Sequence, residues 1–187
     1  GTEEFDDLYL KYEADKTIPK KTVPAQDLFF DLLKERAETG RIYIMNLDHC
    51  NSHSSFKDKV SMSNLCQEIT LPTTPIQDIH DEQGEIALCI LSAVNVGGLN
   101  DLNELESICD LSVRALEQII DYQDYPVKAA EVSTKKRRSL GIGYIGLAHY
   151  LAKHGVKYSD PKAWELVDRL TEAFQYNLLR ASCNIAM

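Results

Sequence analysis

The sequence lacks several features that would place it in large classes of protein. No apolar segment approaches the roughly 20 residues that a membrane-spanning helix needs, and the first residues do not form the apolar stretch of a signal peptide. Internal repeats and low-complexity tracts are absent as well. We therefore expect a soluble, cytoplasmic protein with no membrane partner.

Positive charge is also scarce. Twenty Lys and Arg residues face 29 Asp and Glu residues, so the formal net charge is -9 at pH 7. Binding to nucleic acid depends on neutralising phosphates, which this balance disfavours, and we expect no nucleic-acid partner. The run Lys135–Arg138 is the exception, and we interpret it as a solvated patch before a helix.

Cysteines are few and irregularly spaced. An odd number without a secretory segment indicates reduced thiols and not a disulfide framework. Cys109 and Cys183 fall in helical patterns, which predicts small packed residues. The five cysteines are Cys50, Cys66, Cys89, Cys109 and Cys183.

Length and composition suit one ordinary domain. The chain has 187 residues, of which 44% are hydrophobic, enough for a real core. It begins at Gly1 without an initiator Met and stops at Met187 while a helical pattern is still running. We expect a piece of a larger protein or one part of a split protein.

The first 45 residues read as helix, linker, helix and strand, an order typical of α/β proteins. A first helix starts at Thr2, and a second opens at Thr22–Pro24 and ends at Gly40. Residues 41–45 are predicted as a strand. The second helix is predicted to bury Leu28, Phe29, Leu32 and Leu33.

Strands and helices alternate in the rest of the chain. A long polar loop, residues 46–63, leads to predicted strands at 68–71 and 85–91, the second buried on both faces as in a parallel sheet. Helices are predicted from a capping box at Asp101 and Glu104, over residues 144–154, and from Asp160–Pro161 onward; a short extended piece is predicted at 140–143. The last helix should present Trp164, Val167, Leu170, Phe174 and Leu178 on its apolar face.

The stretch Ser63–Glu68 is the densest polar cluster. Asn64, Cys66 and Glu68 alternate with other residues, so an extended backbone would point an amide, a thiol and a carboxylate the same way. Cys89 lies in the next predicted strand, and two adjacent parallel strands could bring the Cys66 and Cys89 thiols into one pocket. Periodicity alone equally allows two buried thiols that are neighbours by chance.

Two other patterns suggest different chemistry. Residues 141–146 match the G-x-G-x-x-G dinucleotide fingerprint, but a four-cation run and a two-residue stub precede it instead of a proper strand; close packing at a strand-to-helix corner explains the glycines better. His49, Cys50 and His53, with Cys66 as a fourth donor, could form a zinc site, yet no second short-spaced couple exists. A hydrogen-bonded loop is the better interpretation.

Four segments of the sequence are the most distinctive. They are Ser63–Ile69 followed by Leu71-Pro72, Gly84–Ser92, Arg41–Asn46 with Asp48–Asn51, and Arg137–Gly143. The most specific element is the N-x-C-x-E motif at 64–68 with a downstream cysteine. Together these segments closely resemble the large catalytic subunit of class I ribonucleotide reductase, and the resemblance runs in order along essentially the whole chain.

The resemblance implies a fold and a set of roles. The fold would be a ten-stranded α/β barrel of two five-stranded parallel halves, of which this chain forms only a part. Residues 1–40 would be a helical lead-in, residues 41–98 strands and the finger loop, and residues 99–187 helices and a connecting strand. Cys66 would become a thiyl radical that removes the 3′ hydrogen of the ribose, in a water-shielded interior. Glu68 would accept the 3′-hydroxyl proton, Asn64 would orient the sugar hydroxyls beside Ser63 and Leu65, and Cys89 would deliver reducing equivalents.

The resemblance also implies what this chain does not supply. The partner of Cys89, the diphosphate-binding loop, the radical-transfer tyrosines and the regulatory domain lie elsewhere in the family's subunit. The di-metal centre and radical belong to a small partner subunit, a thioredoxin or glutaredoxin dithiol serves as reductant, and this chain should bind no cofactor or metal. Three hypotheses result: part of a ribonucleoside-diphosphate reductase that is inactive alone, a non-catalytic split or truncated segment that assembles with other fragments, and a zinc module.

Overall fold

A computed structural model describes residues 3–187 and divides the chain into two compact units, Gly1–Thr73 and Thr74–Met187. We call these the N-terminal unit and the C-terminal unit. The expected helix start at Thr2 lies outside the described residues. No helix within residues 3–187 is long and apolar enough to cross a membrane.

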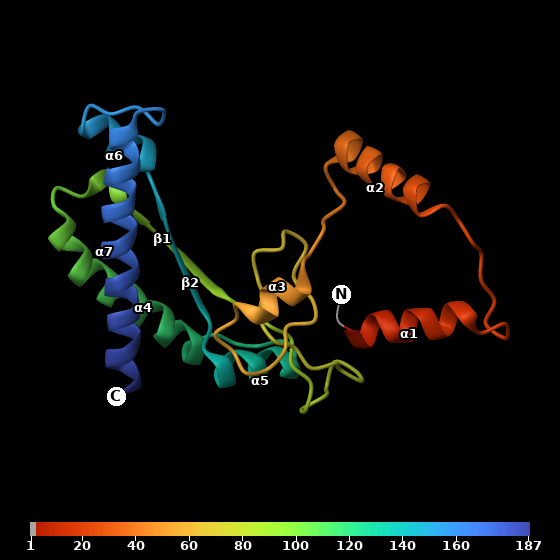
Figure 1. Cartoon of the computed structure of the whole chain (residues 1–187). Helices are drawn as coiled ribbons and strands as arrows, with labels where there is room; N and C mark the ends of the chain where they lie inside the picture. The colour runs from red at the N-terminus through yellow and green to blue at the C-terminus, as the bar shows by residue number, and fades with distance from the viewer. Residues whose placement is uncertain (1–2) are drawn as a thin grey trace. The chain divides into compact units, whose positions relative to one another are not determined.

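The N-terminal unit contains helices α1 (Glu3–Ala14), α2 (Ala25–Thr39) and α3 (Leu47–Ser52) (Figure 1). The first two confirm the predicted helices. Gly40 ends α2 with φ 66°, and its N–H donates to the Arg36 carbonyl at 2.9 Å. This left-handed conformation is the one that glycine adopts most easily, which explains why the helix ends at this residue.

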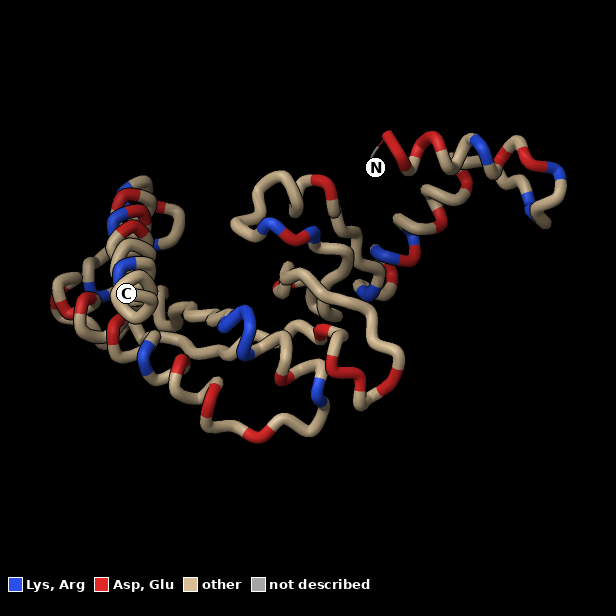
Figure 2. The backbone as a smooth tube through the Cα atoms, turned by 90° about the horizontal axis from the view of Figure 1, so that it is seen from below, with Lys and Arg blue, Asp and Glu red and all other residues tan. Residues whose placement is uncertain are grey.

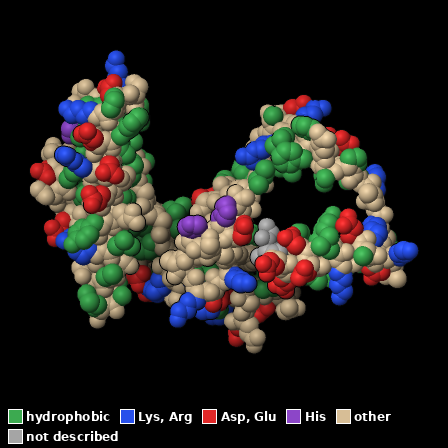
Figure 3. Space-filling view, viewed as in Figure 1, with side chains coloured by type: hydrophobic (Ala, Val, Ile, Leu, Met, Phe, Trp, Pro, Cys, Tyr) green, Lys and Arg blue, Asp and Glu red, His purple; other side chains and the backbone are tan. Residues whose placement is uncertain are grey.

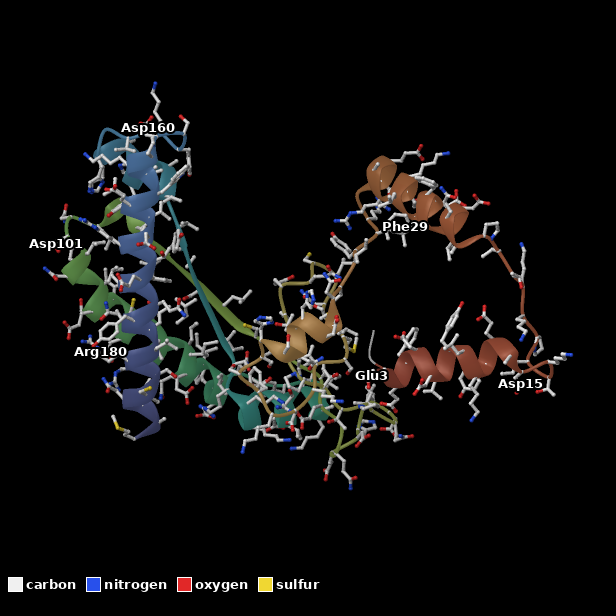
Figure 4. All side chains as sticks on the ribbon, viewed as in Figure 1. Glu3, Asp15, Phe29, Asp101, Asp160 and Arg180 are labelled. Atoms are coloured by element: carbon white, nitrogen blue, oxygen red, sulfur yellow. The ribbon has the colours of Figure 1, made fainter. Side chains whose placement is uncertain are left out.

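The predicted burial of α2 is wrong. Neither α1 nor α2 has a buried residue among those described, and green apolar side chains are visible on both helices in Figure 3. Phe29, labelled on α2 in Figure 4, is 57% exposed, and Leu28 is 61% exposed. Leu33 is exposed and Leu32 half-buried. An apolar helix face is buried only where a second element covers it.

Two predicted strands do not form. Residues 41–45 and 68–71 have no strand structure, and α3 occupies part of the expected loop at 46–63. A strand exists only where a neighbouring strand accepts and donates its backbone hydrogen bonds. Within the described part of the chain, the sheet consists of β1 and β2, both in the C-terminal unit.

The sheet pairs β1 (Ile90–Asn95) with β2 (Leu140–Ile145) in parallel, with Ile90 opposite Leu140 and Asn95 opposite Ile145. The strand predicted at 85–91 therefore starts too early. Glu85 instead forms an isolated antiparallel bridge with Thr74 through two backbone hydrogen bonds of 3.0 and 3.2 Å. The N–H and carbonyl of Glu85 are therefore hydrogen-bonded to Thr74 and do not pair with β2.

Helices cover one face of this sheet. α4 (Leu105–Tyr122) and α7 (Pro161–Ala186) lie against each other beside the strands (Figure 1). α5 (Lys128–Arg137) and α6 (Leu147–Lys153) complete the unit, with short 3₁₀ turns at Val96–Gly98 and Leu102–Glu104. The core includes Val94, Val96, Leu99, Leu105, Cys109, Tyr150, Leu151, Val156, Ala163, Leu170 and Phe174.

Helices begin close to both predicted starts, but the reciprocal capping box at Asp101 and Glu104 is not formed: Asp101 caps the 3₁₀ turn before α4, and α4 and α7 have no side-chain cap hydrogen bond. Asp101 accepts a hydrogen bond from the Asn103 N–H at 2.8 Å, and Glu104 accepts one from the Asn100 N–H at 3.3 Å. Asp160 and Pro161 begin α7. Both Asp101 and Asp160 are labelled in Figure 4, as is Arg180 of α7, whose guanidinium pairs with Glu106 of α4 at 2.9 Å.

Three details of this unit differ from prediction. Tyr144 and Ile145 belong to β2 and not to a helix, because Gly146 turns the chain with φ 81° before α6. Trp164 is 71% exposed, since Ala163 faces the core instead. The basic run Lys135–Arg138 lies at the end of α5, a helix that the sequence patterns did not predict.

Candidate active site

The polar motif forms a turn and not an extended strand. The Gln67 N–H donates to the Asn64 carbonyl at 3.1 Å, and Gln67 has φ 62°. Positive φ reverses the chain direction and is uncommon for a residue with a side chain. The prediction that period-2 geometry aligns Asn64, Cys66 and Glu68 is therefore wrong.

Side-chain hydrogen bonds close residues 63–69 into what we call the motif loop. Ser63 Oγ donates to the Ile69 carbonyl at 2.7 Å, and Asn64 Oδ1 accepts from the Ile69 N–H at 3.0 Å. Ser63 Oγ also lies 3.2 Å from Asn64 Oδ1. These bonds satisfy the backbone where no second strand is present to do so.

The tip of the motif loop presents chemically useful groups to solvent. Leu65 is 79% exposed, and Cys66 and Glu68 are exposed as well. Among the described residues, none accepts a hydrogen bond from Asn64 Nδ2, so this amide can still donate to a ligand. The expected shielding of Cys66 from water is not provided within this unit.

Helix α3 anchors the approach to the motif loop. Asn51 Oδ1 accepts from the Val60 N–H at 2.8 Å, and Asn51 Nδ2 donates to the Val60 carbonyl at 2.8 Å. Val60 is buried. A pocket of about 260 Å³ is lined by residues from 44–50, from the motif loop and from the residue directly after it: Ile44, Met45, Asn46, His49, Cys50, Gln67 and Thr70.

The alternative zinc site finds no support in the geometry. His53 Nδ1 lies 3.0 Å from the His49 carbonyl and 2.9 Å from Ser52 Oγ, so this segment is hydrogen-bonded as expected, but as helix α3 and its C-cap and not as a loop. Within residues 3–187, no group of three or more His, Cys, Asp and Glu side chains is arranged to hold a metal ion.

Cys89 lies in the C-terminal unit, directly before β1, and is half-buried. Alternation along the strands places Val94 and Tyr144 toward α4 and α7, where the Tyr144 and Phe174 rings meet edge to face at 5.6 Å. The second face of the sheet carries Leu91 and Ala93 of β1 and Gly141 and Gly143 of β2.

The Cys89 sulfur lies on this second face. A Cβ atom built on Gly141 would lie 2.8 Å from Cys89 Sγ and 2.5 Å from Leu91 Cδ2. Cys66 and Cys89 were expected on two adjacent parallel strands. That strand pair is not formed, because residues 68–71 are not a strand. The motif loop and Cys89 belong to separate units.

An ion cluster around the buried side chain of Glu85, four residues before Cys89, was not predicted. Glu85 is only 5% exposed, and its two carboxylate oxygens accept from Lys136 Nζ at 2.5 Å and from Arg137 Nε at 2.6 Å. The basic run, seen as a continuous blue stretch in Figure 2, is therefore more than a solvated patch. Arg138 pairs with Glu117 and, at 2.8 Å, with Asp121.

The pKa of Glu85 reflects opposing effects. Burial by itself would raise the pKa, but the hydrogen bonds and positive charges of Lys136 and Arg137 together outweigh it and hold the pKa below its ordinary value. One sequence signal could have indicated the interaction of Glu85 with Lys136 and Arg137. It is a glutamate at the start of an apolar run, with four consecutive cations farther along the chain.

The glycine fingerprint is not formed. Gly141 and Gly143 lie inside β2 and not in a turn after it, whereas the dinucleotide fingerprint needs its first glycines at the strand-to-helix turn. Gly146 occupies that turn, and a Cβ atom there would collide with Asn95 Oδ1. This confirms close packing at the strand-to-helix corner for Gly146 alone, because Gly141 and Gly143 lie inside β2 and a Cβ atom on Gly143 would meet nothing within 4 Å.

Comparison with known proteins shows that the whole chain matches one protein family. The family model described as "Ribonucleotide reductase, barrel domain" matches residues 1–187. The chain is 58% identical over 187 residues to the "Ribonucleoside-diphosphate reductase subunit alpha" of Haemophilus influenzae, covering 98% of this chain and 25% of that protein.

Similarity extends to subunits from other organisms. The "Ribonucleoside-diphosphate reductase 1 subunit alpha" of Escherichia coli is 54% identical over 187 residues, with 98% of this chain and 25% of that protein covered. The corresponding subunit of Enterobacteria phage T4 is 39% identical over 187 residues, with 97% and 24% covered. The chain thus spans about a quarter of the length of these relatives, and it belongs to the ribonucleotide reductase barrel-domain family.

Proposed function

We propose that this chain is the central part of the catalytic alpha subunit of a ribonucleoside-diphosphate reductase. The complete subunit would reduce ribonucleoside diphosphates to deoxyribonucleoside diphosphates, the precursors for DNA replication. The observation that carries the proposal is the N-x-C-x-E motif, held in a closed loop with Cys66 at its tip, within a chain that matches the family from end to end.

The motif loop supplies the groups that the first chemical step requires. Cys66, as a thiyl radical, removes the 3′ hydrogen of the ribose, because an S–H bond is weak enough to exchange with a ribose C–H bond. Glu68 accepts the proton of the 3′-hydroxyl. Asn64 orients the sugar hydroxyls through Nδ2, and Ser63 and Leu65 complete the contacts to substrate. The short closed loop supports this role by restricting the positions of all these groups.

Cys89 takes part in the reducing step. Its thiol and a partner thiol from another part of the subunit lose two hydrogens and form one disulfide, while the ribose C2′–OH bond is replaced by C2′–H and the hydroxyl leaves as water. The location of Cys89 on the face of the sheet opposite α4 and α7 supports this role. In an α/β barrel the helices cover the outside of the strands, and the other face lines the interior.

The remaining apparatus lies outside this chain. We propose that the complete fold is a ten-stranded barrel, that a small subunit with a di-metal centre generates the radical, and that a thioredoxin or glutaredoxin dithiol reduces the disulfide. The other segments of the large subunit would bind the substrate diphosphate and shield Cys66 from water.

Serine variants of the complete subunit test these roles. We expect Cys66→Ser to abolish deoxynucleotide formation in the presence of the small subunit and a dithiol. Cys89→Ser should prevent multiple turnover, because the disulfide can no longer form and be reduced again. Cys183→Ser is the matched control, since this thiol is exposed on α7 and not packed as the helical pattern predicted, and it should keep full activity. Normal multiple turnover in either of the first two variants would contradict the assignment.

A second candidate function is assembly without catalysis, as a split or truncated segment. The exposed apolar side chains of α1 and α2 favour it, because faces of this kind mark surfaces that another part of a protein covers. Co-purification with the other reductase segments would support it. In both cases the chain alone, given a radical source and a dithiol, should form no deoxynucleotide; product formation by the chain alone would contradict this expected inactivity.

A further inference from the structure

We propose that Gly141 is a positioning residue for the thiol of Cys89. The proposal rests on the redox role proposed above for Cys89. Because Gly141 has no side chain, the space beside β2 is available to the Cys89 sulfur. Any larger residue at this position would displace the sulfur from the place where it reacts.

The geometry of the sheet explains why these residues meet. Gly141 lies opposite Leu91 in the parallel register, and alternation along the strand puts the side chain two residues before Leu91 on the same face. A Cβ atom at Gly141 would lie 2.8 Å from Cys89 Sγ and 2.5 Å from Leu91 Cδ2. Ordinary contacts between such atoms begin at about 3.5 Å, so at least one of the two side chains would have to move.

The two side chains differ in how easily they can move. Leu91 is 64% exposed, so its terminal methyl groups can turn into solvent. Cys89 is half-buried and has only one side-chain torsion that moves its sulfur. An added methyl group at position 141 therefore acts chiefly on the direction of the Cys89 thiol.

Gly143 provides a matched comparison within the same strand. It lies on the same face of β2, but a Cβ atom there would meet nothing within 4 Å. Neither glycine has positive φ, so alanine is compatible with the backbone at both positions. The two alanine variants differ in one respect, the contact with Cys89 and Leu91.

Displacement of the sulfur matters because disulfide formation has strict geometry. The two sulfur atoms must approach to about 2.05 Å with a defined dihedral angle. In each turnover both thiols are oxidised to the disulfide while the ribose is reduced, and an external dithiol then returns two hydrogens. A sulfur displaced by about 1 Å would slow both exchanges, by a factor on the order of 10².

The test uses two measurements on wild type, Gly141→Ala and Gly143→Ala. In this chain, the rate of Cys89 alkylation by iodoacetamide is measured by peptide mass spectrometry, with Cys183 as internal standard. In the complete subunit with its small subunit and a dithiol, kcat and KM are measured. We expect Gly141→Ala to slow alkylation several-fold and to lower kcat by a factor on the order of 10² with KM unchanged, while Gly143→Ala matches wild type.

Each outcome decides the proposal. Equal alkylation rates in the two alanine variants would overturn it, as would slower alkylation with kcat equal to that of Gly143→Ala. If the Cys89→Ser subunit turns over normally, the redox role proposed for Cys89 is wrong, and no effect of Gly141→Ala on kcat is then expected. The alkylation rates would still show whether Gly141 positions the Cys89 sulfur. If Gly141→Ala does not fold, the double variant Gly141→Ala/Leu91→Ala removes the leucine contact, and the same two measurements apply to it.

Discussion

Glu85 is a buried carboxylate whose charge should contribute to stability. Replacing it by glutamine keeps its size but leaves Arg137, itself only 9% exposed, without this carboxylate. We expect Glu85→Gln to lower the free energy of unfolding at neutral pH by about 2 kcal/mol, the typical contribution of a hydrogen bond to a charged group. Urea denaturation followed by circular dichroism measures the change.

The difference between wild type and Glu85→Gln should depend on pH in one direction. Because the pKa of Glu85 is lowered on folding from 4.5, its contribution is complete above that value and disappears as the pH falls through the lower pKa of the folded state. Glu131→Gln is the control, since Glu131 likewise pairs with two cations, Lys128 and Lys135, but lies nearer the surface, and its effect should be much smaller. A difference that does not change with pH would contradict the role of the charge.

At the scale of elements, α7 offers a direct test of which residues face the core. Leu170 is fully buried, whereas Trp164 is 71% exposed, although the helical pattern placed both on one apolar face. We expect Leu170→Ala to lower the free energy of unfolding by about 3 kcal/mol and Trp164→Ala by less than about 0.5 kcal/mol. Urea denaturation of both variants measures the difference, and a larger loss for the tryptophan variant would show that the face is assigned wrongly.

Local patterns predicted the helices better than the strands. α4 was predictable because its apolar residues recur at helical spacing, and those facing the core are buried: Leu105, Cys109, Val113, Leu116 and Ile120. The strands predicted at 41–45 and 68–71 depend on partners distant in sequence, and no local pattern reveals whether such partners are present. The turn at Gln67 was also unpredictable, since glutamine has no preference for positive φ.

The candidate site was predictable in its residues and not in its geometry. The resemblance pointed to Asn64, Cys66, Glu68 and Cys89 as reactive groups, and those roles stay predictions until the variants are assayed. Gly141 and Glu85 were not identified, because their importance depends on contacts with residues about 50 positions away in sequence. The hydrogen bonds of Ser63 and Asn64 to Ile69 likewise required the folded loop.

At the scale of the whole chain, the two units differ in how much they bury. The core of buried apolar side chains lies in the C-terminal unit, whereas α1 and α2 bury no described residue. Helices of 12 and 15 residues are marginal in water without tertiary packing. Most of the stability of this chain alone should therefore come from residues 74–187.

Hydrogen exchange measured by mass spectrometry tests this division. In this chain alone, amides of α1 and α2 should exchange at least about 100-fold faster than those in the middle of α4 and α7, because opening an uncovered helix costs little free energy. In the complete subunit, the same α1 and α2 peptides should become protected, since the exposed apolar side chains would then be covered. Equal protection of α1, α2 and α4 in the chain alone would contradict the division, and unchanged rapid exchange in the complete subunit would show that these apolar faces are not contact surfaces.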